Sequence, residues 1–540
     1  MPPMTTTNTK WMKWGLGGFF TVTGLLLGLV LFGDDLRRLH GASADSLAGE
    51  EYVTPRTRSF AASGTDTRKT LSHFSATTES YGGPAAPQPA LAPNGFVLAD
   101  RDAKSTFAID VDTASYTYAR RQLQAGLRVE PTTVRVEEWV NAFRYDLESP
   151  TDQPWAIHVE GAPSPFTAGR TLLKVSLQGR RVSSEARVPA NLVLLVDVSG
   201  SMAGEDRLPL AKRAMHQLVD QLDARDRVAL VTYAGSTRVV LASTSGADQR
   251  ALHRAIDGLT PGGGTAMGNG MELAFREALR HARPGVASRV MVFTDGDANI
   301  GPVGHGAILE RVKHAVAEGV MLTTVGVGMG NHRAHDLEQL ADHGNGQSLY
   351  LDGPAEAERV FSQRNLPGLL QVLSKDVKVQ VAFEDSVVRR YRLLGYENRD
   401  VADADFRNDA VDGGELGAGH TVTALYELEL SGPGPLGTVS VRGLEPTTRA
   451  PFEVSRRLSA DVLARSVNET SADFRFATAV AMAADVLRGN HAAGVSLREA
   501  KALAETALGG WPERAEFVQL LERALSLEGA QATARLHDGY

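Results

Sequence analysis

The feature that most constrains the fold is a regular alternation of apolar and amphipathic runs between Asn191 and about Leu370. Its apolar runs are short, continuous and rich in valine and leucine: LVLLVDV, RVALVTYA, RVMVFTD and MLTTVGVG. Such runs are typical of strands that are covered on both faces. The segments between them, such as RLPLAKRAMHQLVDQL and AILERVKHAVAEG, space their apolar residues as an α-helix does. Strands that alternate with helices predict a doubly wound α/β domain with a mainly parallel sheet.

Patterns typical of β-strands flank this α/β unit on both sides. From Trp155 to Leu195, strand-like runs break at glycine and proline. Residues 377–383 and 422–430 alternate between apolar and polar side chains, as half-buried antiparallel strands do. We therefore expect the two flanks to pair, with the α/β unit inserted into a β-sandwich. Helical spacing rich in alanine follows from Asp473 to Leu527.

The start of the chain predicts a membrane anchor. No charged residue occurs from Trp14 to Phe32, and a helix of that length spans roughly 30 Å. A cleaved signal peptide is the alternative, because residues 42–44 (Ala-Ser-Ala) have a small-x-small form, although they lie further from the apolar run than cleavage sites usually do. Arg37 and Arg38 nearly cancel the two lysines that precede the run, so the positive-inside rule does not decide the orientation.

A very short N-terminal tail is most simply left in the cytoplasm. The expectation is thus a single-pass protein of the inner (cytoplasmic) membrane whose bulk is periplasmic or otherwise extracytoplasmic. Residues 41–104 are rich in Ser, Thr, Ala, Gly and Pro, which predicts a disordered linker. The complete division is a tail and transmembrane anchor (1–40), this linker (41–104), an N-terminal segment with β-strands (105–190), the α/β domain (191–373), a β-rich domain (374–455) and a C-terminal helical region (456–540).

Composition narrows the chemistry that the chain can carry. Its 540 residues include no cysteine, which excludes disulfides, cysteine-ligated zinc and iron–sulfur clusters. A net charge of −8 argues against a nucleic-acid-binding surface, because such a surface needs clustered lysine and arginine.

Oxygen-bearing side chains follow the predicted strands of the α/β unit at their carboxyl ends. Asp197 ends LVLLVD, and Ser199 and Ser201 come directly after it. Asp295 follows RVMVFT in the same way, and Thr265 lies in the glycine-rich segment LTPGGGTAMGNG. Ligands of doubly wound sheets bind at these strand ends, so we expect the five side chains to converge. An all-oxygen set suits Mg²⁺, or Mn²⁺ or Ca²⁺, and needs neither histidine nor cysteine.

The segments DVSGS, GGGT and TDG together resemble the metal-ion-dependent adhesion site of von Willebrand factor type A (VWA) domains, and the same five residues match it position by position. The segments STFAIDVDTASY, RLLGYENRD and GAGHTVTALYELEL are similar to a bacterial family in which a VWA domain stands between a conserved N-terminal segment and a C-terminal domain of unknown function. The resemblance implies that the hydroxyl groups bind the ion directly and the carboxylates bind it directly or through water. It also implies that the last domain helix, Ala355 to Leu370, shifts when ligand binds.

These features predict a membrane-tethered, non-enzymatic protein-binding module. Neutral hydroxyl ligands leave the charge of a divalent ion partly uncompensated, so an acidic side chain of a partner protein is expected to complete its shell. The N-terminal helix would contact the membrane, and no nucleic acid is expected. No base, nucleophile or GxSxG motif accompanies the five oxygen ligands.

Two alternatives stay open. The segment FAIDVDTAS predicts a strand that ends in Asp110 and Asp112, as in phosphatases of the haloacid dehalogenase type, so a Mg²⁺-dependent phosphatase or hydrolase could use Asp110 or the same metal. Ala114 departs from that pattern, and no parallel α/β domain follows before Trp155 to supply the other residues. The second alternative is a cytosol-facing assembly factor that works with a ring ATPase, as some VWA proteins do.

Overall fold

The structure is a computed structural model that describes residues 92–165, 167–264, 267–296, 305–328, 334–490 and 495–537. All of these residues belong to one compact unit that spans residues 79–540. The expected anchor and most of the expected linker lie outside the described residues. Across the described ranges, no helix has the length and apolar character needed to cross a membrane.

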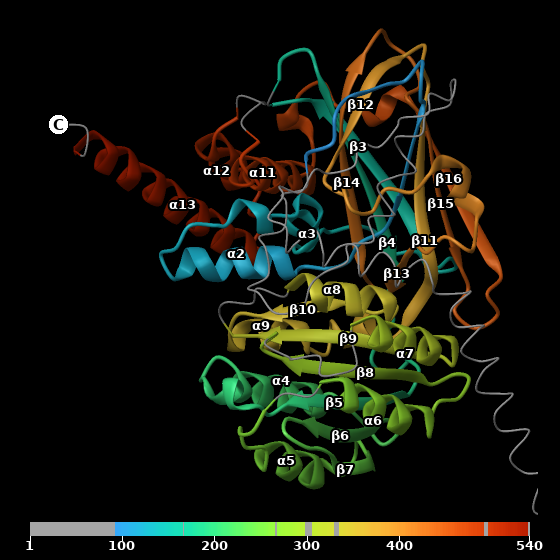
Figure 1. The fold of residues 1–540 in the computed structure, drawn as a ribbon. Coiled ribbons are helices and arrows are strands. Elements are labelled where there is room, and N and C mark those ends of the chain that lie inside the picture. The colour runs from blue at the N-terminus through green and yellow to red at the C-terminus, as the bar shows by residue number, and fades with distance from the viewer. Residues whose placement is uncertain are drawn as a thin grey trace, which may run out of the picture. The chain divides into compact units, whose positions relative to one another are not determined.

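A six-stranded sheet forms the α/β unit, with strand order β10-β9-β8-β5-β6-β7 (Figure 1). Neighbouring strands run parallel, except that the edge strand β7 is antiparallel to β6. Every residue of β5 is buried, which explains its unbroken apolar sequence. The strands are β5 (Ala190–Asp197), β6 (Arg227–Tyr233), β7 (Thr237–Ser245), β8 (Ala287–Thr294), β9 (Val320–Val327) and β10 (Ser348–Leu351).

Helices cover both faces of this sheet, so the expected doubly wound α/β fold is confirmed. One apolar core joins the sheet to α4, α5, α9 and α10, and a second joins its other face to α6, α7 and α8. The helices are α4 (Leu208–Asp220), α5 (Gln249–Asp257), α6 (Met267–Leu279), α7 (His305–Ala317), α8 (Ala334–His343), α9 (Pro354–Val360) and α10 (Leu366–Leu370).

The prediction that one continuous helix runs from Ala355 to Leu370 is wrong. The structure has two short helices, α9 and α10, with a turn between them in which the Ser362 hydroxyl accepts a hydrogen bond from the Asn365 N–H at 3.3 Å. Pro367 explains the break, because proline is tolerated in the first turn of a helix but not in its interior.

Two further sheets face each other across one apolar core, to which Trp155 and Tyr426 contribute from one sheet and Val379 and Val441 from the other. The first sheet has the order β1-β12-β14-β4-β3, and the second is β13-β11-β15-β16 with β2 paired to β11. These strands are β1 (Val97–Leu98), β2 (Lys104–Ala108), β3 (Trp155–Pro163), β4 (Thr171–Gly179), β11 (Val372–Phe383), β12 (Val388–Leu394), β13 (Gly414–Gly417), β14 (Thr421–Leu430), β15 (Gly437–Leu444) and β16 (Pro451–Leu458).

The α/β unit is inserted into this β-sandwich. Strand β4, which precedes the insertion, pairs antiparallel with β14, which follows it, in a register that sets Thr171 opposite Leu428. The expected pairing of the two flanks therefore occurs, although β11 pairs with β2, β13 and β15 instead of β3 or β4. Regular structure also begins earlier than the expected Ser105, because β1 already pairs with β12.

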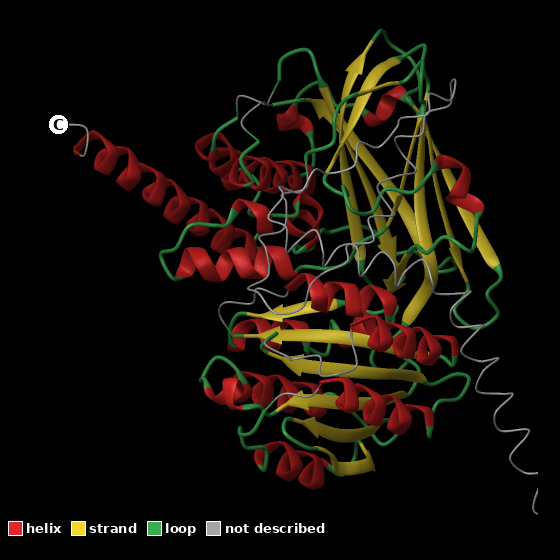
Figure 2. Ribbon diagram, viewed as in Figure 1, coloured by secondary structure: helices red, strands yellow, loops and turns green. Residues whose placement is uncertain are grey.

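Helices from the two ends of the described chain pack together beside the sandwich (Figure 2). Tyr116 of α2 and Trp139 of α3 share a core with Phe476 of α11 and Phe517 of α13. The helices are α2 (Ala114–Gln124), α3 (Val136–Asn141), α11 (Ala472–Leu487), α12 (Leu497–Glu505) and α13 (Pro512–His537). Short 3-10 turns lie at Pro131–Thr133, Gly200–Ala203, Asp403–Arg407, Ala460–Val462 and Val467–Glu469.

Candidate metal centre

Two buried carboxylates lie at the carboxyl ends of neighbouring strands. Asp197 is the last residue of β5, and Asp295 follows the last residue of β8. The two strands are parallel and adjacent, so their ends meet at the same edge of the sheet. Asp197 is fully buried, and Asp295 is 6% exposed. The adjacency of β5 and β8 therefore brings the ends of the two strands that carry these aspartates side by side.

The loop after β5 brings its two serines to the same edge. The Ser199 N–H donates a hydrogen bond to Oδ1 of Asp197 at 2.8 Å, which turns the chain back over the strand end. The hydroxyl oxygens of Ser199 and Ser201 are 3.0 Å apart. Met202 is completely buried in the core below this loop. The structure thus places Asp197 and both serines in one small cluster.

The glycine-rich loop is tied to this cluster through its backbone. The Gly200 N–H donates to the Gly263 carbonyl at 3.1 Å, and the Gly262 N–H donates to the Val198 carbonyl at 2.7 Å. Gly263 has φ +89, and a Cβ there would lie 3.1 Å from the backbone nitrogen of Gly235, so a side chain would be strained. Thr265, the remaining expected ligand, lies outside the described residues, two positions beyond this contact.

Two residues that the sequence analysis missed lie against Asp197. The Thr294 hydroxyl donates to Oδ2 of Asp197 at 3.2 Å and accepts from the Gly296 N–H at 3.1 Å. Tyr233 pairs with Asp197 in the register of β6 and β5, and its side chain is completely buried. Burial, followed by the charge of Asp197, raises the pKa of Tyr233 well above its usual value. Strand register carries these contacts, and residue spacing alone gives no signal for them.

Arg207 is a third residue that the sequence analysis missed. Its Nη1 donates to the Ser201 carbonyl at 2.5 Å and to Oδ2 of Asp295 at 3.1 Å. The side chain packs on Gly328, where a Cβ would lie 2.9 Å from Cγ of Arg207. Arg207 precedes α4, and in the sequence it reads as an ordinary residue at a helix start. A cation of the protein therefore already contacts one of the two carboxylates.

The electrostatics of the cluster suit a cation. Burial raises the pKa of Asp197 above its usual value and the negative charge of Asp295 adds to this, while hydrogen bonds from Ser199 work in the opposite direction. A divalent ion would relieve the repulsion between two carboxylates that share a poorly solvated edge. Over the ranges that the structure describes, no three His, Asp or Glu side chains are placed so that together they could hold one metal ion, and in this cluster hydroxyl groups accompany the two carboxylates. This all-oxygen set fits Mg²⁺.

Helix α2 of the N-terminal segment contacts both the loop after β5 and the strand β10 of the α/β unit. Nη2 of Arg121 lies 2.5 Å from Oδ2 of Asp206, which adjoins Arg207. Nη1 of Arg121 donates to the Tyr350 hydroxyl at 3.3 Å, and that hydroxyl donates to the Gly328 carbonyl at 2.5 Å. A continuous set of contacts therefore runs from α2 to the residue on which Arg207 packs.

The alternative nucleophile, Asp110, lies in a different place and is 4% exposed. Its Oδ1 accepts from the Asp112 N–H at 2.9 Å, and its Oδ2 accepts from Nε of Arg399 at 3.3 Å. Asp112 in turn accepts from the Ser348 N–H of β10 at 2.9 Å. A nucleophile must be reached by its substrate, whereas these two aspartates tie the N-terminal segment to the α/β unit.

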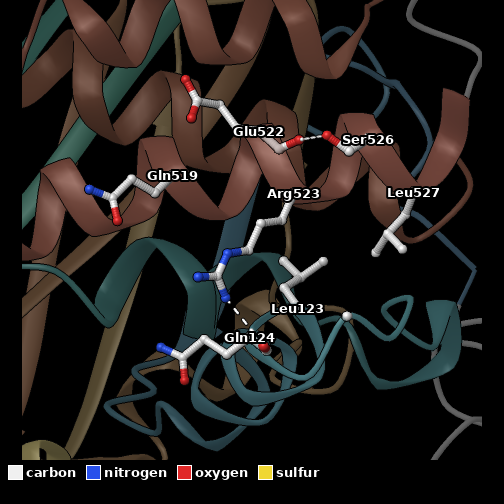
Figure 3. Close-up of a pocket in the computed structure, with 8 residues that line it drawn as sticks. Leu123, Gln124, Gln519, Glu522, Arg523, Ser526 and Leu527 are labelled. Atoms are coloured by element: carbon white, nitrogen blue, oxygen red, sulfur yellow. Dashed lines mark hydrogen bonds between the residues drawn. The ribbon is translucent and has the colours of Figure 1, made fainter.

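A surface pocket of about 640 Å³ lies between α2 and α13, away from these strand ends (Figure 3). Nη1 of Arg523 donates to the Gln124 carbonyl at 3.2 Å, and the Ser526 hydroxyl donates to the Glu522 carbonyl at 2.9 Å. The drawn side chains present no pair of nucleophile and base within hydrogen-bonding reach of each other (Figure 3).

Comparison with known proteins agrees with this architecture. The model of the von Willebrand factor type A domain matches residues 191–363, and a model described as von Willebrand factor matches residues 88–174. The model of the C-terminal region of the uncharacterized protein YfbK matches residues 368–434 and 433–527. The three models together cover the N-terminal segment, the α/β unit and the C-terminal region.

Individual relatives share different lengths of the chain. The Escherichia coli protein named uncharacterized protein YfbK is 37% identical over an alignment of 447 positions that covers 78% of each chain. The 60 kDa subunit of magnesium chelatase from Rhodobacter capsulatus is 38% identical over 113 residues, 20% of this chain and 19% of that protein. A solved von Willebrand factor type A protein from Catenulispora acidiphila is 20% identical, with a TM-score of 0.42 over 70% of this chain and 91% of its own.

Identity of 37% over more than three quarters of both chains goes well beyond the α/β unit, and it includes the flanking strands and helices. The chain belongs to the YfbK family of von Willebrand factor type A domain proteins.

Proposed function

We propose that this protein is a binding module whose VWA domain holds a divalent cation and captures an acidic side chain of a partner protein. The cation is Mg²⁺, or Mn²⁺ or Ca²⁺ in its place, and its ligands are Asp197, Ser199, Ser201, Thr265 and Asp295. The meeting of Asp197 and Asp295 with the serine pair at one edge of the sheet carries the proposal.

Each residue has a distinct part in this proposal. The two serines and Thr265 offer neutral oxygens, and the two aspartates supply the negative charge. Thr294 orients the Asp197 carboxylate through the 3.2 Å hydrogen bond that it donates. The ion, when bound, attracts a carboxylate from outside because the protein ligands compensate its charge only in part. The N-terminal run from Trp14 to Phe32 tethers the module to the inner membrane, with the folded part outside the cytoplasm.

Titration of the detergent-solubilised full chain with Mg²⁺ in a calorimeter tests the metal site. Asp197→Ala is expected to abolish binding of the ion and capture of the partner, because it removes the most deeply buried carboxylate of the cluster. Asp385→Ala, at an exposed turn after β11, is the matched control and should leave the affinity unchanged. Circular dichroism checks that both variants stay folded. An Asp197→Ala protein that binds Mg²⁺ like the wild type would refute the site.

Two further measurements separate this proposal from the alternatives. Turnover of phosphate esters that disappears with EDTA would overturn the non-enzymatic assignment. A C-terminal reporter fusion that is active only in the cytoplasm would overturn the proposed orientation and favour an assembly factor for a ring ATPase.

A further inference from the structure

Two histidines on neighbouring helices of the VWA domain meet edge to edge. Nδ1 of His216 on α4 lies 2.7 Å from Nδ1 of His253 on α5. The rings are within 25° of coplanar, and their centroids are 4.9 Å apart. Nearly coplanar rings have this separation when they point nitrogen atoms at each other. The contact therefore runs through the two nitrogens and is not a face-to-face stack.

Each histidine also faces an aspartate of the opposite helix. Nε2 of His216 lies 3.1 Å from Oδ1 of Asp257, and Nε2 of His253 lies 3.1 Å from Oδ1 of Asp220. The sequence behind this arrangement repeats, because each helix carries a histidine followed four residues later by an aspartate. That spacing places both side chains on one face of each helix. The two helices thus present matching faces, and each carboxylate holds the ring of the other helix.

Hydrogen-bond chemistry shows that the quartet formed by the two histidines with Asp220 and Asp257 lacks a positive species between the rings. A carboxylate only accepts hydrogen bonds, so Nε2 of His216 carries the hydrogen that it donates to Asp257, and the Asp220 carboxylate 3.1 Å from Nε2 of His253 favours a hydrogen on that nitrogen as well. Both Nδ1 atoms are then bare acceptors that face each other at 2.7 Å. Two lone pairs at this distance repel unless a positive species lies between them. A shared proton is one such species, and a metal ion is the other.

We propose that His216 and His253 bind a transition-metal ion through their Nδ1 atoms, with Zn²⁺ as the expected ion and Ni²⁺ or Cu²⁺ as substitutes. Imidazole nitrogen is a preferred ligand of all three ions. Asp257 and Asp220 fix the tautomer and orientation of the rings, as carboxylates do behind metal-bound histidines. Two Zn–N bonds of about 2.0–2.1 Å at a tetrahedral angle need nitrogens about 3.3 Å apart, so on binding the rings move slightly apart from their 2.7 Å contact and also turn until both lone pairs point at the ion.

The site is open to solvent and chemically distinct from the strand-end cluster. The side chains of His216 and His253 are 27% and 33% exposed, so an ion can enter directly and water can complete its coordination. The strand-end cluster offers only oxygen, which favours Mg²⁺, whereas this pair offers only nitrogen. The bound ion would link α4 to α5, the helix that packs on the edge strand β7.

Zinc titration of the detergent-solubilised full chain tests the proposal. We expect His216→Gln and His253→Gln each to lower the affinity for Zn²⁺ by at least about 10-fold, because each removes one of two ligands. Asp220→Asn keeps both ligands but removes one orienting carboxylate, so we expect it to lower the affinity for Zn²⁺ by about 10-fold or more. His281→Gln, a histidine of the same domain outside the quartet, is the matched control.

A spectroscopic readout identifies the ligands independently of affinity. Electron paramagnetic resonance of the protein with one equivalent of Cu²⁺ should show coupling to two imidazole nitrogens, and His253→Gln should remove it. Equal Zn²⁺ affinity in the wild type, His216→Gln and His253→Gln would overturn the proposal, provided that melting curves show all three proteins folded. Asp197→Ala should bind Zn²⁺ normally at this site, so failure of the Mg²⁺ site and failure of this one are distinguishable.

Discussion

Arg207 is the residue whose role at the candidate metal centre differs most from its sequence context. It stands one residue before α4, yet its guanidinium contacts Oδ2 of Asp295 and the Ser201 carbonyl. A guanidinium on a carboxylate competes with a metal ion for the same oxygen. Arg207 therefore places a positive charge of the protein at the candidate metal centre, even though it offers an ion no ligand atom.

Replacement of Arg207 by glutamine should raise the affinity of the full chain for Mg²⁺. A unit charge about 4 Å away contributes about 1 kcal/mol in water and about 4 kcal/mol near a protein surface, so a gain of about 5-fold or more is expected. Calorimetric titration of Mg²⁺ measures it. Arg213→Gln, which removes an exposed charge from α4, should leave the affinity unchanged. A lower affinity in Arg207→Gln would mean that Arg207 is needed to shape the loop.

Helix α2 is joined to the VWA domain by ion pairs of its two arginines. Arg120 of α2 binds Asp352 at 2.6 Å and Glu356 of α9 at 2.8 Å, while Arg121 reaches the loop after β5. Burial acts to raise the pKa of Glu356, but Arg359 and Arg120 outweigh it and lower the pKa to about 2. Glu356 is therefore a buried, ionised side chain that depends on its arginine partners.

Arg120→Gln should destabilise the protein by about 2–4 kcal/mol, because it leaves buried carboxylates with one partner fewer. Glu356 has a lowered pKa, so its contribution to stability is present above its ordinary value of 4.5 and is lost as the pH falls through about 2. The decrease in the free energy of unfolding caused by Arg120→Gln should therefore be constant from pH 6 to pH 8. Thermal unfolding measures it, with Arg276→Gln on the exposed side of α6 as the control. Equal melting temperatures for Arg120→Gln and wild type would contradict the assignment.

At the scale of the whole molecule, Arg399 joins three distant parts of the chain. Its guanidinium lies 3.3 Å from Asp110 of the N-terminal segment and 3.1 Å from Asp342 of α8, and it comes itself from the segment after β12. More carboxylates than arginines surround this junction. Burial, together with neighbouring carboxylates, raises the pKa of Asp342 to about 6 despite Arg399 and raises the pKa of Glu137 to about 7.

Because the pKa values of Glu137 and Asp342 are raised, these two carboxyl groups contribute more to stability in acid than in base. A carboxyl group with a raised pKa contributes fully below its unfolded value, 4.5 for Glu137, and the contribution is lost as the pH rises through about 7. Glu137→Gln, which mimics the protonated form, should therefore stabilise the protein by up to about 3 kcal/mol at pH 8 and change little at pH 4.5. Melting temperatures at the two pH values test this. The control is Glu318→Gln, because the side chain of Glu318 is exposed. Stabilisation of equal size at both pH values would argue against ionisation as the cause.

Local patterns in the sequence were sufficient to predict much of this architecture. Continuous apolar runs predict strands covered on both faces, and the doubly wound sheet follows from their alternation with helices. The positions of Asp197 and Asp295 after such runs predict that both lie at the carboxyl edge, which the structure confirms. These features are local, because hydrophobic periodicity and residue spacing depend only on near neighbours in the sequence.

Contacts between segments that are distant in the sequence determine which other residues surround Asp197 and Asp295 and which histidines meet. Tyr233 and Thr294 reach Asp197 through strand register, and Arg207 reaches Asp295 across 88 positions of the sequence. His216 and His253, 37 positions apart, meet only because α4 packs against α5. Such pairs depend on how whole elements are oriented against one another. No local pattern encodes that orientation, which arises when the apolar faces of many elements are buried together.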